Sequence, residues 1–333
     1  MTVTQSLVCT TRRMTMRPTL LNRSWLMLLL LAFVTAASAC GGTAVEQDDT
    51  RPESERNAEP APLNSKVYVT AQELQQFANE GATIIDARAL EDYEAGHFPG
   101  AVHTDGGKAW KDDNGFLITD VVEAQQKVRD LGIDRDRKVV IYADARDSGA
   151  GRLFWTLEYF GHGEVYLYPN DYSALKGELA FEEQTDAPSI EEGDFVVAYR
   201  DSVLATRDEV EQAVNGDLEA ILIDTRREGE FNGTEDRGDP RQGYIPGAVW
   251  YYYENVWDEN NELRSKEALR TEFDEVGLLQ ENAVLLPYCQ TGTRSATIYA
   301  VLRWLGVDNA QNYDGSWVEW SDSELPIEQP QNQ

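Results

Sequence analysis

The chain has few cysteines, few histidines and few basic residues. Three cysteines and three histidines occur among its 333 residues, and 29 lysines and arginines are outnumbered by 59 aspartates and glutamates. The formal net charge of -30 repels a phosphate backbone, so we exclude nucleic acid as a partner. The three histidines, His97, His103 and His162, lie far along the chain from the last cysteine, Cys289. This scarcity argues against a Cys–His hydrolase.

The remaining composition is that of a folded protein with room for about two domains. Hydrophobic residues make up 41% of the chain and aromatic residues 10%. A chain of this length can bury cores large enough to be stable without disulfides.

The first 39 residues resemble an export signal. Arginines precede an apolar stretch from Trp25 to Val34, and small residues lead up to Cys40. The apolar stretch is short for a membrane-spanning helix. A cysteine directly after small residues resembles the bacterial lipoprotein signal, which implies cleavage before Cys40 and lipidation of that residue. The alternatives are an uncleaved membrane anchor and plain secretion.

Processing at Cys40 leaves a single free thiol. Cys9 is removed and Cys40 is acylated, so Cys289 alone keeps its thiol and no intramolecular disulfide can form. We expect an exported protein, anchored to a bacterial membrane only through lipid and facing the periplasm or the cell exterior. An unpaired cysteine is a liability in an oxidising compartment unless it is used, which favours chemistry at Cys289 over an inert buried role.

An internal repeat follows a polar segment. Residues 40–65 are polar and poor in large apolar side chains, which is typical of a flexible tether. Beyond them, three runs occur twice: Ile84-Ile85-Asp86-Ala87-Arg88 and Leu222-Ile223-Asp224-Thr225-Arg226, Phe98-Pro99-Gly100-Ala101-Val102 and Ile245-Pro246-Gly247-Ala248-Val249, and Leu157-Glu158-Tyr159-Phe160-Gly161 and Leu302-Arg303-Trp304-Leu305-Gly306. The repeat predicts a first domain at residues 66–181, a linker at 182–194 and a second domain at 195–328.

Each repeat alternates short β-branched runs with helical patterns. This alternation predicts an α/β fold in which a mainly parallel sheet is flanked by helices. A constant spacing of 145 residues from Val139 onward makes Asp144 the expected counterpart of Cys289. Ligands bind beyond the carboxyl ends of parallel strands, so we expect Arg226 and Cys289 to lie around one crevice.

The loop after Cys289 is suited to hold an anionic sulfur. The thiolate is the reactive form of cysteine, and backbone N–H groups turned inward stabilise it. Gly292 supplies a permissive backbone, a helix expected to begin near Ser295 adds its positive end, and Arg294 adds a full charge. The candidate binding residues of this loop are Gln290, Thr291, Gly292, Thr293 and Arg294.

Together these motifs resemble those of tandem-domain rhodaneses, the thiosulfate and 3-mercaptopyruvate sulfurtransferases. The resemblance extends from about Val67 to Leu325. It rests on the two Asp-x-Arg runs, the runs His97-Phe98-Pro99-Gly100-Ala101 and Tyr244-Ile245-Pro246-Gly247-Ala248, the loop from Tyr288 to Arg294, and Tyr313-Asp314-Gly315-Ser316-Trp317.

The resemblance implies a double displacement that requires neither metal nor organic cofactor. Cys289 takes the outer sulfur of a donor as a persulfide and passes it to cyanide or a thiol. Arg226 is expected to bind the sulfonate or carboxylate of the donor. The first domain, with Asp144 in place of cysteine, is expected to be non-catalytic, and Arg88 to be structural.

Three alternatives remain open at this point. The first alternative is a cysteine phosphatase, whose loop places five residues between cysteine and arginine. Four residues separate Cys289 from Arg294, which argues against it. The second is a mercaptopyruvate sulfurtransferase; such enzymes have an arginine where this chain has Asn232, and both this difference and the bulkier Gln290 favour thiosulfate as the donor. A non-enzymatic module that holds a persulfide or a partner is the third alternative.

Overall fold

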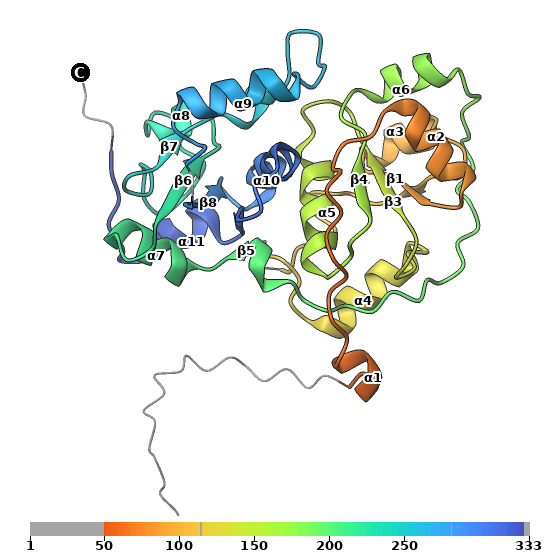
Figure 1. Ribbon diagram of the computed structural model, residues 1–333, viewed down its shortest axis with the longest axis horizontal. Coiled ribbons are helices and arrows are strands. Elements are labelled where there is room, and N and C mark those ends of the chain that lie inside the picture. Colours follow the sequence, from red (N-terminus) through yellow and green to blue (C-terminus); the bar gives the residue numbers. More distant parts are fainter. Residues whose placement is uncertain (1–49, 114, 281, 330–333) are drawn as a thin grey trace, which may run out of the picture. The chain divides into compact units, whose positions relative to one another are not determined.

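The computed structural model describes residues 50–113, 115–280 and 282–329. Residues from Gln47 onward form one compact unit, in which two α/β halves follow one another along the chain (Figure 1). The predicted signal peptide at 1–39 and the predicted lipidation site Cys40 lie outside the described residues. Within the described part, no helix is long and apolar enough to cross a membrane.

The first half is a parallel sheet in the order β2-β1-β3-β4. Its strands are β1 (Thr83–Asp86), β2 (Val102–His103), β3 (Val139–Tyr142) and β4 (Val165–Leu167). Its helices are α1 (Glu53–Arg56), α2 (Ala71–Asn79), α3 (Leu90–Ala95), α4 (Val121–Asp130), α5 (Ser148–Tyr159) and α6 (Tyr172–Leu179). Successive strand residues face opposite sides. Ile84 shares a core with α2 and α6, whereas Ile85 shares a core with α4 and α5.

The second half repeats this layout, with a sheet in the order β7-β6-β8 and a small β5-β9 pair. Its strands are β5 (Leu204–Ala205), β6 (Ala220–Asp224), β7 (Val249–Trp250), β8 (Val284–Tyr288) and β9 (Asn312–Tyr313). Its helices are α7 (Arg207–Asn215), α8 (Glu228–Phe231), α9 (Lys266–Glu275), α10 (Thr293–Leu305) and α11 (Ser316–Asp322), with 3₁₀ turns at Asp201–Val203 and Tyr253–Val256. The predicted fold, two tandem halves with parallel sheets flanked by helices, is confirmed.

Pro287 shortens the ladder on the outer side of β8. The N–H of Leu285 donates to Asn309, and the carbonyl of Leu285 accepts from Gln311, so one parallel bridge forms beside Ala310. The next donor along β8 would be residue 287, and proline has no N–H to give. The ladder therefore stops there, whereas the corresponding strands β3 and β4 of the first half pair over three residues.

The structure corrects the predicted spacing between the two repeats. Tyr142 and Tyr288 end β3 and β8, and each hydroxyl donates at 2.7 Å to the aspartate that ends the neighbouring central strand. Each hydroxyl also accepts a hydrogen bond from one backbone N–H, that of Phe98 before β2 for Tyr142 and that of Ile245 before β7 for Tyr288. The two tyrosines are therefore equivalent, and the counterpart of Cys289 is Ala143 rather than Asp144. The prediction was wrong by one residue because the loop before α5 is one residue longer than the loop before α10.

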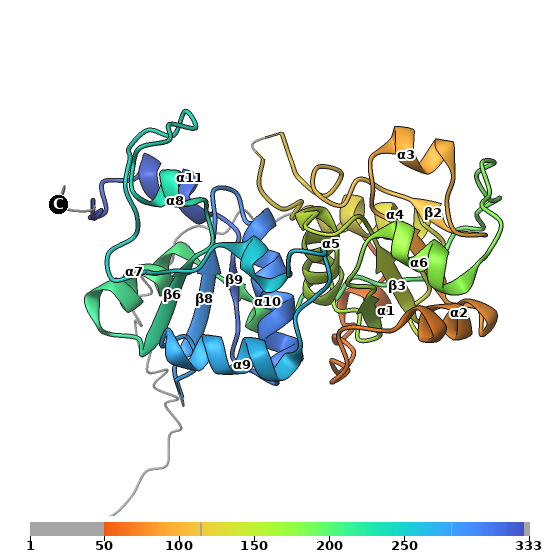
Figure 2. The same ribbon diagram turned by 90° about the horizontal axis from the view of Figure 1, so that it is seen from above.

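The two halves share a core along α5 and α10 (Figure 2). Gly151 of α5 lies against Thr297 of α10, where a Cβ on residue 151 would be 2.9 Å from the Thr297 Cα. Next to this contact, the buried carboxylate of Glu158 accepts the Tyr299 hydroxyl at 2.6 Å and pairs with Arg303 at 3.3 Å. The interface thus combines close helix packing with a hydrogen-bonded buried charge pair, as burial of a charge requires.

Two segments predicted as tether and domain boundary pack on the first half. Glu55 forms an ion pair with Arg129 at 3.1 Å, so the described part of the predicted tether, residues 50–65, is held on α4. The backbone N–H of Ala198 donates at 2.9 Å to the carbonyl that follows α5. Residues 195–200, predicted to begin the second domain, therefore belong to the connection that lies along the first half.

Gly151→Ala should lower the free energy of unfolding by about 1 to 3 kcal/mol, because the added methyl group pushes α5 away from the backbone of α10. The matched control is Gly177→Ala in α6, where nothing lies within 4 Å of an added Cβ. This control should be neutral or stabilise the fold by up to about 1 kcal/mol. Urea unfolding measures both, and equal effects would contradict the close packing.

Candidate active site

Cys289 directly follows the end of β8 and is 1% exposed. The chain then turns into α10, which begins at Thr293, two residues before the predicted start. Gly292 is the residue before the helix and has a φ of 73°, a conformation that favours glycine. The positive end of a helix of 13 residues therefore lies next to the sulfur, as predicted.

The loop carbonyls are turned away from the sulfur. Each carbonyl from Cys289 to Gly292 accepts a hydrogen bond from outside the loop. In order, the donors are the N–H of Trp317 (3.0 Å), the N–H of Val318 (3.0 Å), the ammonium of Lys111 (2.7 Å) and the side-chain amide of Asn312 (3.1 Å). Because the carbonyls are held outward, the N–H groups of Thr291 and Ser295 face the sulfur and bond to it.

Ser316 fixes the two ends of this turn. Its hydroxyl oxygen accepts the N–H of Cys289 at 3.1 Å and the N–H of Gly292 at 2.9 Å, while its proton goes to the carbonyl of Tyr313 at 2.7 Å. Ser316 has a φ of 52°, an uncommon backbone conformation for a residue other than glycine. The run from Tyr313 to Trp317, which the sequence singled out only by resemblance, therefore supports the cysteine loop.

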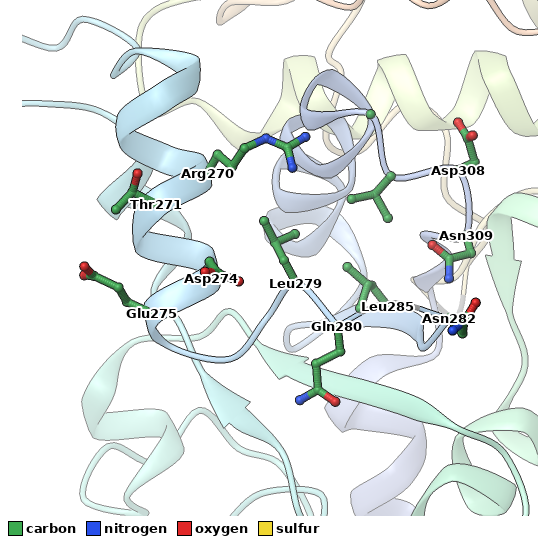
Figure 3. Close-up of a pocket in the computed structure, with 12 residues that line it drawn as sticks. Arg270, Thr271, Asp274, Glu275, Leu279, Gln280, Asn282, Leu285, Asp308 and Asn309 are labelled. Carbon is green, nitrogen blue, oxygen red and sulfur yellow. The ribbon is translucent and has the colours of Figure 1, made fainter.

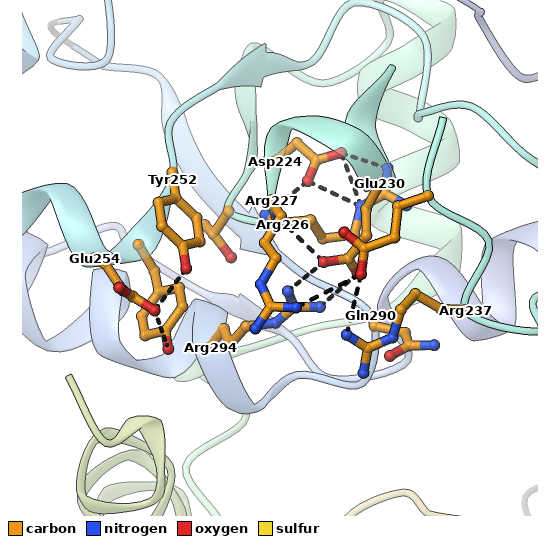
Figure 4. A network of polar contacts seen from close by, with 12 residues as sticks. Asp224, Arg226, Arg227, Glu230, Arg237, Tyr252, Glu254, Gln290 and Arg294 are labelled. Atoms are coloured by element: carbon orange, nitrogen blue, oxygen red, sulfur yellow. Dashed lines mark hydrogen bonds and ion pairs between the residues drawn. The ribbon is translucent and has the colours of Figure 1, made fainter. Parts of the chain in front are cut away.

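Arg294 and the loop N–H groups favour the thiolate. Burial raises the pKa of Cys289, but Arg294, the N–H groups of Ser295 and Thr291, and the Ser295 hydroxyl together lower it by more. Arg294 is itself held by Glu230 through two hydrogen bonds, at 2.6 and 2.8 Å (Figure 4). The geometry agrees with the predicted roles of Arg294 and Thr291. Glu230 was not predicted, because it lies in the short helix α8 outside the repeated motifs.

The expected role of Arg226 as a donor ligand is wrong. Its side chain is 1% exposed and bonds to both carboxylate oxygens of Asp224, at 3.0 and 2.6 Å. The guanidinium also lies 4.6 Å from the ring centre of Trp317. Arg88 repeats this arrangement with Asp86 in the first half. Both arginines are therefore internal supports for the ends of the central strands.

Two further predicted loop residues, Gln290 and Gly292, contact other parts of the protein. The Gln290 amide donates to Asp239 at 3.1 Å. A Cβ on Gly292 would lie 2.8 Å from Nη1 of Arg152 and closer still to Asp314, so no side chain fits at this position.

Groups from the first half reach the back of the loop. Arg152 of α5 is fully buried and forms an ion pair with Asp314 of the second half. The other carboxylate oxygen of Asp314 accepts the N–H of Leu117 at 2.9 Å. Lys111 belongs to the same first-half segment as Leu117. Arg152, Leu117 and Lys111 lie in no motif of the sequence, so these contacts with the loop could not be predicted.

A large surface pocket lies elsewhere in the second half (Figure 3). It is lined by α9, including Arg270 and Asp274, and by the chain around Asp308 and Asn309. Leu285, which also lines it, is near the start of β8, whereas Cys289 follows the other end of that strand. The pocket is therefore separate from the cysteine loop. Within the described residues, no cluster of His, Cys, Asp and Glu side chains is arranged to hold a metal ion.

Comparison with known proteins places this geometry in a family. Residues 70–178 and 206–323 each match the family described as Rhodanese-like domain. The chain is 30% identical over 304 residues to a thiosulfate sulfurtransferase of Corynebacterium glutamicum, covering 85% of this chain and 96% of that protein. It is 31% identical over 242 residues to the sulfur carrier protein TtuD of Thermus thermophilus, covering 68% of this chain and 83% of TtuD.

A solved structure gives the same result. The crystal structure of SseA from Escherichia coli, a 3-mercaptopyruvate sulfotransferase, matches with a TM-score of 0.66 and 26% identity, over 76% of this chain and 99% of SseA. The chain belongs to the family of proteins with rhodanese-like domains. Its enzyme class is that of the sulfurtransferases.

The internal roles of Arg226 and Arg88 can be tested as a matched pair. Arg226→Lys and Arg88→Lys should each lower the free energy of unfolding by about 2 to 4 kcal/mol, because lysine cannot bond to both oxygens of a buried carboxylate. The KM for the sulfur donor should stay unchanged in both, as measured by steady-state kinetics on folded protein. A raised KM with unchanged stability in Arg226→Lys alone would restore a donor-binding role.

Proposed function

We propose that this chain transfers sulfane sulfur from thiosulfate to cyanide or a thiol acceptor through a persulfide on Cys289. The observation that supports the proposal is the inward-facing N–H cradle around a buried cysteine whose pKa is lowered. A cradle of this kind stabilises a sulfur anion in both resting and persulfide forms.

The two steps balance without a cofactor. The Cys289 thiolate attacks the outer sulfur of thiosulfate, a new S–S bond to Sγ forms, and sulfite leaves with the electron pair of the broken S–S bond. Cyanide or a thiolate then attacks the outer sulfur of the persulfide, and the cysteine thiolate is released. The N–H groups of Thr291 and Ser295 and the charge of Arg294 offset the negative charge throughout.

The surroundings of the loop favour thiosulfate over mercaptopyruvate. An arginine is the residue best suited to hold the carboxylate of mercaptopyruvate. At the position where mercaptopyruvate enzymes have this arginine, the chain has Asn232. The Asn232 side chain instead accepts the N–H and hydroxyl of Thr234, at 3.1 and 2.6 Å.

Incubation with thiosulfate should give a cyanide-labile persulfide on Cys289, detected by mass spectrometry, and Cys289→Ser should abolish turnover while leaving thermal unfolding unchanged. The kcat/KM should be higher for thiosulfate than for mercaptopyruvate. Residual turnover in Cys289→Ser would reject the mechanism, and a higher kcat/KM for mercaptopyruvate would reject the donor. A stable persulfide that transfers to no thiol would favour the alternative of a non-enzymatic sulfur-binding module.

We also propose that the protein is exported and anchored by lipid at Cys40, facing the periplasm or the cell exterior. The support is in the sequence: arginines, a short apolar stretch and small residues precede Cys40. A polar segment follows it, which is suited to separate a membrane surface from the folded halves.

Cys40→Ala should prevent incorporation of labelled fatty acid and release the protein from the membrane fraction of a bacterial host. Cys9→Ala is the matched control, because Cys9 lies within the segment that would be removed, and labelling should be unchanged. Labelling that survives Cys40→Ala, or a Cys40→Ala protein that stays in the membrane fraction, would contradict lipidation at this residue.

A further inference from the structure

Arg294 brings its positive charge to Cys289 but shares it with a carboxylate. Its charge lowers the pKa of the cysteine, while Glu230 holds it through two hydrogen bonds. Arg226 is held by Asp224 in the same way. A further cation near the loop therefore adds to the stabilisation of a thiolate or persulfide on Cys289.

Two cations of the first half lie on the other side of the loop. Lys111 donates to the carbonyl of Thr291 at 2.7 Å, and Arg152 pairs with Asp314 next to Gly292. Asp314 acts on both cations, and Asp112, next to Lys111 in the chain, also acts on the lysine. Nε and Nη2 of Arg152 are buried without a hydrogen-bond partner among the described residues.

Four donors hold the loop carbonyls away from the sulfur, and Lys111 is the one that comes from the first half. The other three donors come from the second half, at residues 312, 317 and 318. Holding the Thr291 carbonyl away from the sulfur keeps the orientation in which the Thr291 N–H reaches it. Loss of the lysine therefore removes both a charge and a hydrogen bond from the active loop.

We propose that Lys111 of the non-catalytic half is a positioning residue for the catalytic cysteine, adding a positive charge beside the loop that holds the Cys289 sulfur anion and anchoring that loop. The first half then acts in the reaction as the source of a second positive charge, in addition to that of Arg294. This inference rests on the proposed function only in taking the sulfur anion of Cys289 as the reactive species.

The ionisation of Lys111 is expected to limit this role at high pH. Burial, followed by Arg152, lowers the pKa of Lys111 to about 8, while Asp314, Cys289 and Asp112 act in the opposite direction. Lys111 is therefore charged below about pH 8 and loses its charge as the pH rises through that value. The charged groups that act on Lys111 are Arg152 on α5, Asp314 before α11 and Asp112 of its own segment, together with the Cys289 sulfur.

The test is the titration of the Cys289 thiolate by its ultraviolet absorbance, taken as the difference between the full-length chain and its Cys289→Ser variant. That subtraction removes the signals of the tyrosines and of the other cysteines. Lys111→Gln keeps a hydrogen-bond donor without the charge, and its midpoint should rise by about 1 pH unit. Lys111→Arg keeps the charge, and its midpoint should stay within about 0.3 pH units of the parent protein.

Lys108→Gln is the matched control, because it removes the same charge from the same segment at an exposed position. Its midpoint should not move. An unchanged midpoint in Lys111→Gln, or equal shifts in Lys111→Gln and Lys108→Gln, would overturn the proposal. Thermal unfolding checks that the variants are folded, and Lys111→Arg gives a second result if Lys111→Gln is unstable: a raised midpoint in Lys111→Arg would also overturn it.

This readout is independent of sulfur transfer. A chain in which Cys289 accepts no sulfur from thiosulfate, yet shows the Lys111-dependent midpoint, would reject the proposed function and keep this inference. A chain that turns over thiosulfate with a midpoint insensitive to Lys111 would do the reverse.

Discussion

The structure depends on keeping a buried sulfur anion stable at the end of a strand. A sulfur that is 1% exposed has lost its water, so a thiolate form can be stabilised only by inward-facing N–H groups and positive charge from the protein. N–H groups face inward only when the carbonyls between them face outward and find donors there. That condition explains why the loop after Cys289 is surrounded by donors from β9, α11 and the first-half segment that carries Lys111.

The duplicated fold supplies those donors by making the two halves unequal. The aspartate–arginine pair that ends each central strand is retained in both, together with the tyrosine that bonds to the aspartate. The cysteine is not retained, since Ala143 occupies its place. The first half instead packs α5 against α10 and contributes Arg152 to the back of the active loop. A domain without a nucleophile thereby completes the surroundings of one.

Much of this could be predicted from the sequence. Strand and helix periods, the repeated Asp-x-Arg runs and the Cys-to-Arg spacing are local patterns, and they led to the α/β fold and to the loop that places Arg294 near Cys289. Two predictions failed because local patterns determine neither burial nor loop length. The role of Arg226 was misjudged, since the side chain is buried and two of its nitrogens bond to Asp224 and Gly243. The one-residue error in the repeat register arose because loop length is not constrained by periodicity.

The sequence by itself indicated the candidate residue, Cys289, because a thiol followed by a glycine-containing turn, an arginine and a helix specifies its own local backbone. Tertiary structure decided which charges act on that thiol. Glu230 and Arg294 are 64 positions apart, Lys111 and Thr291 are 180 positions apart, and no local pattern encodes their contact. A charge acts over the distance between atoms in space rather than along the chain, so the electrostatics of the site emerged only when distant segments packed together, both within the second half and between the two halves.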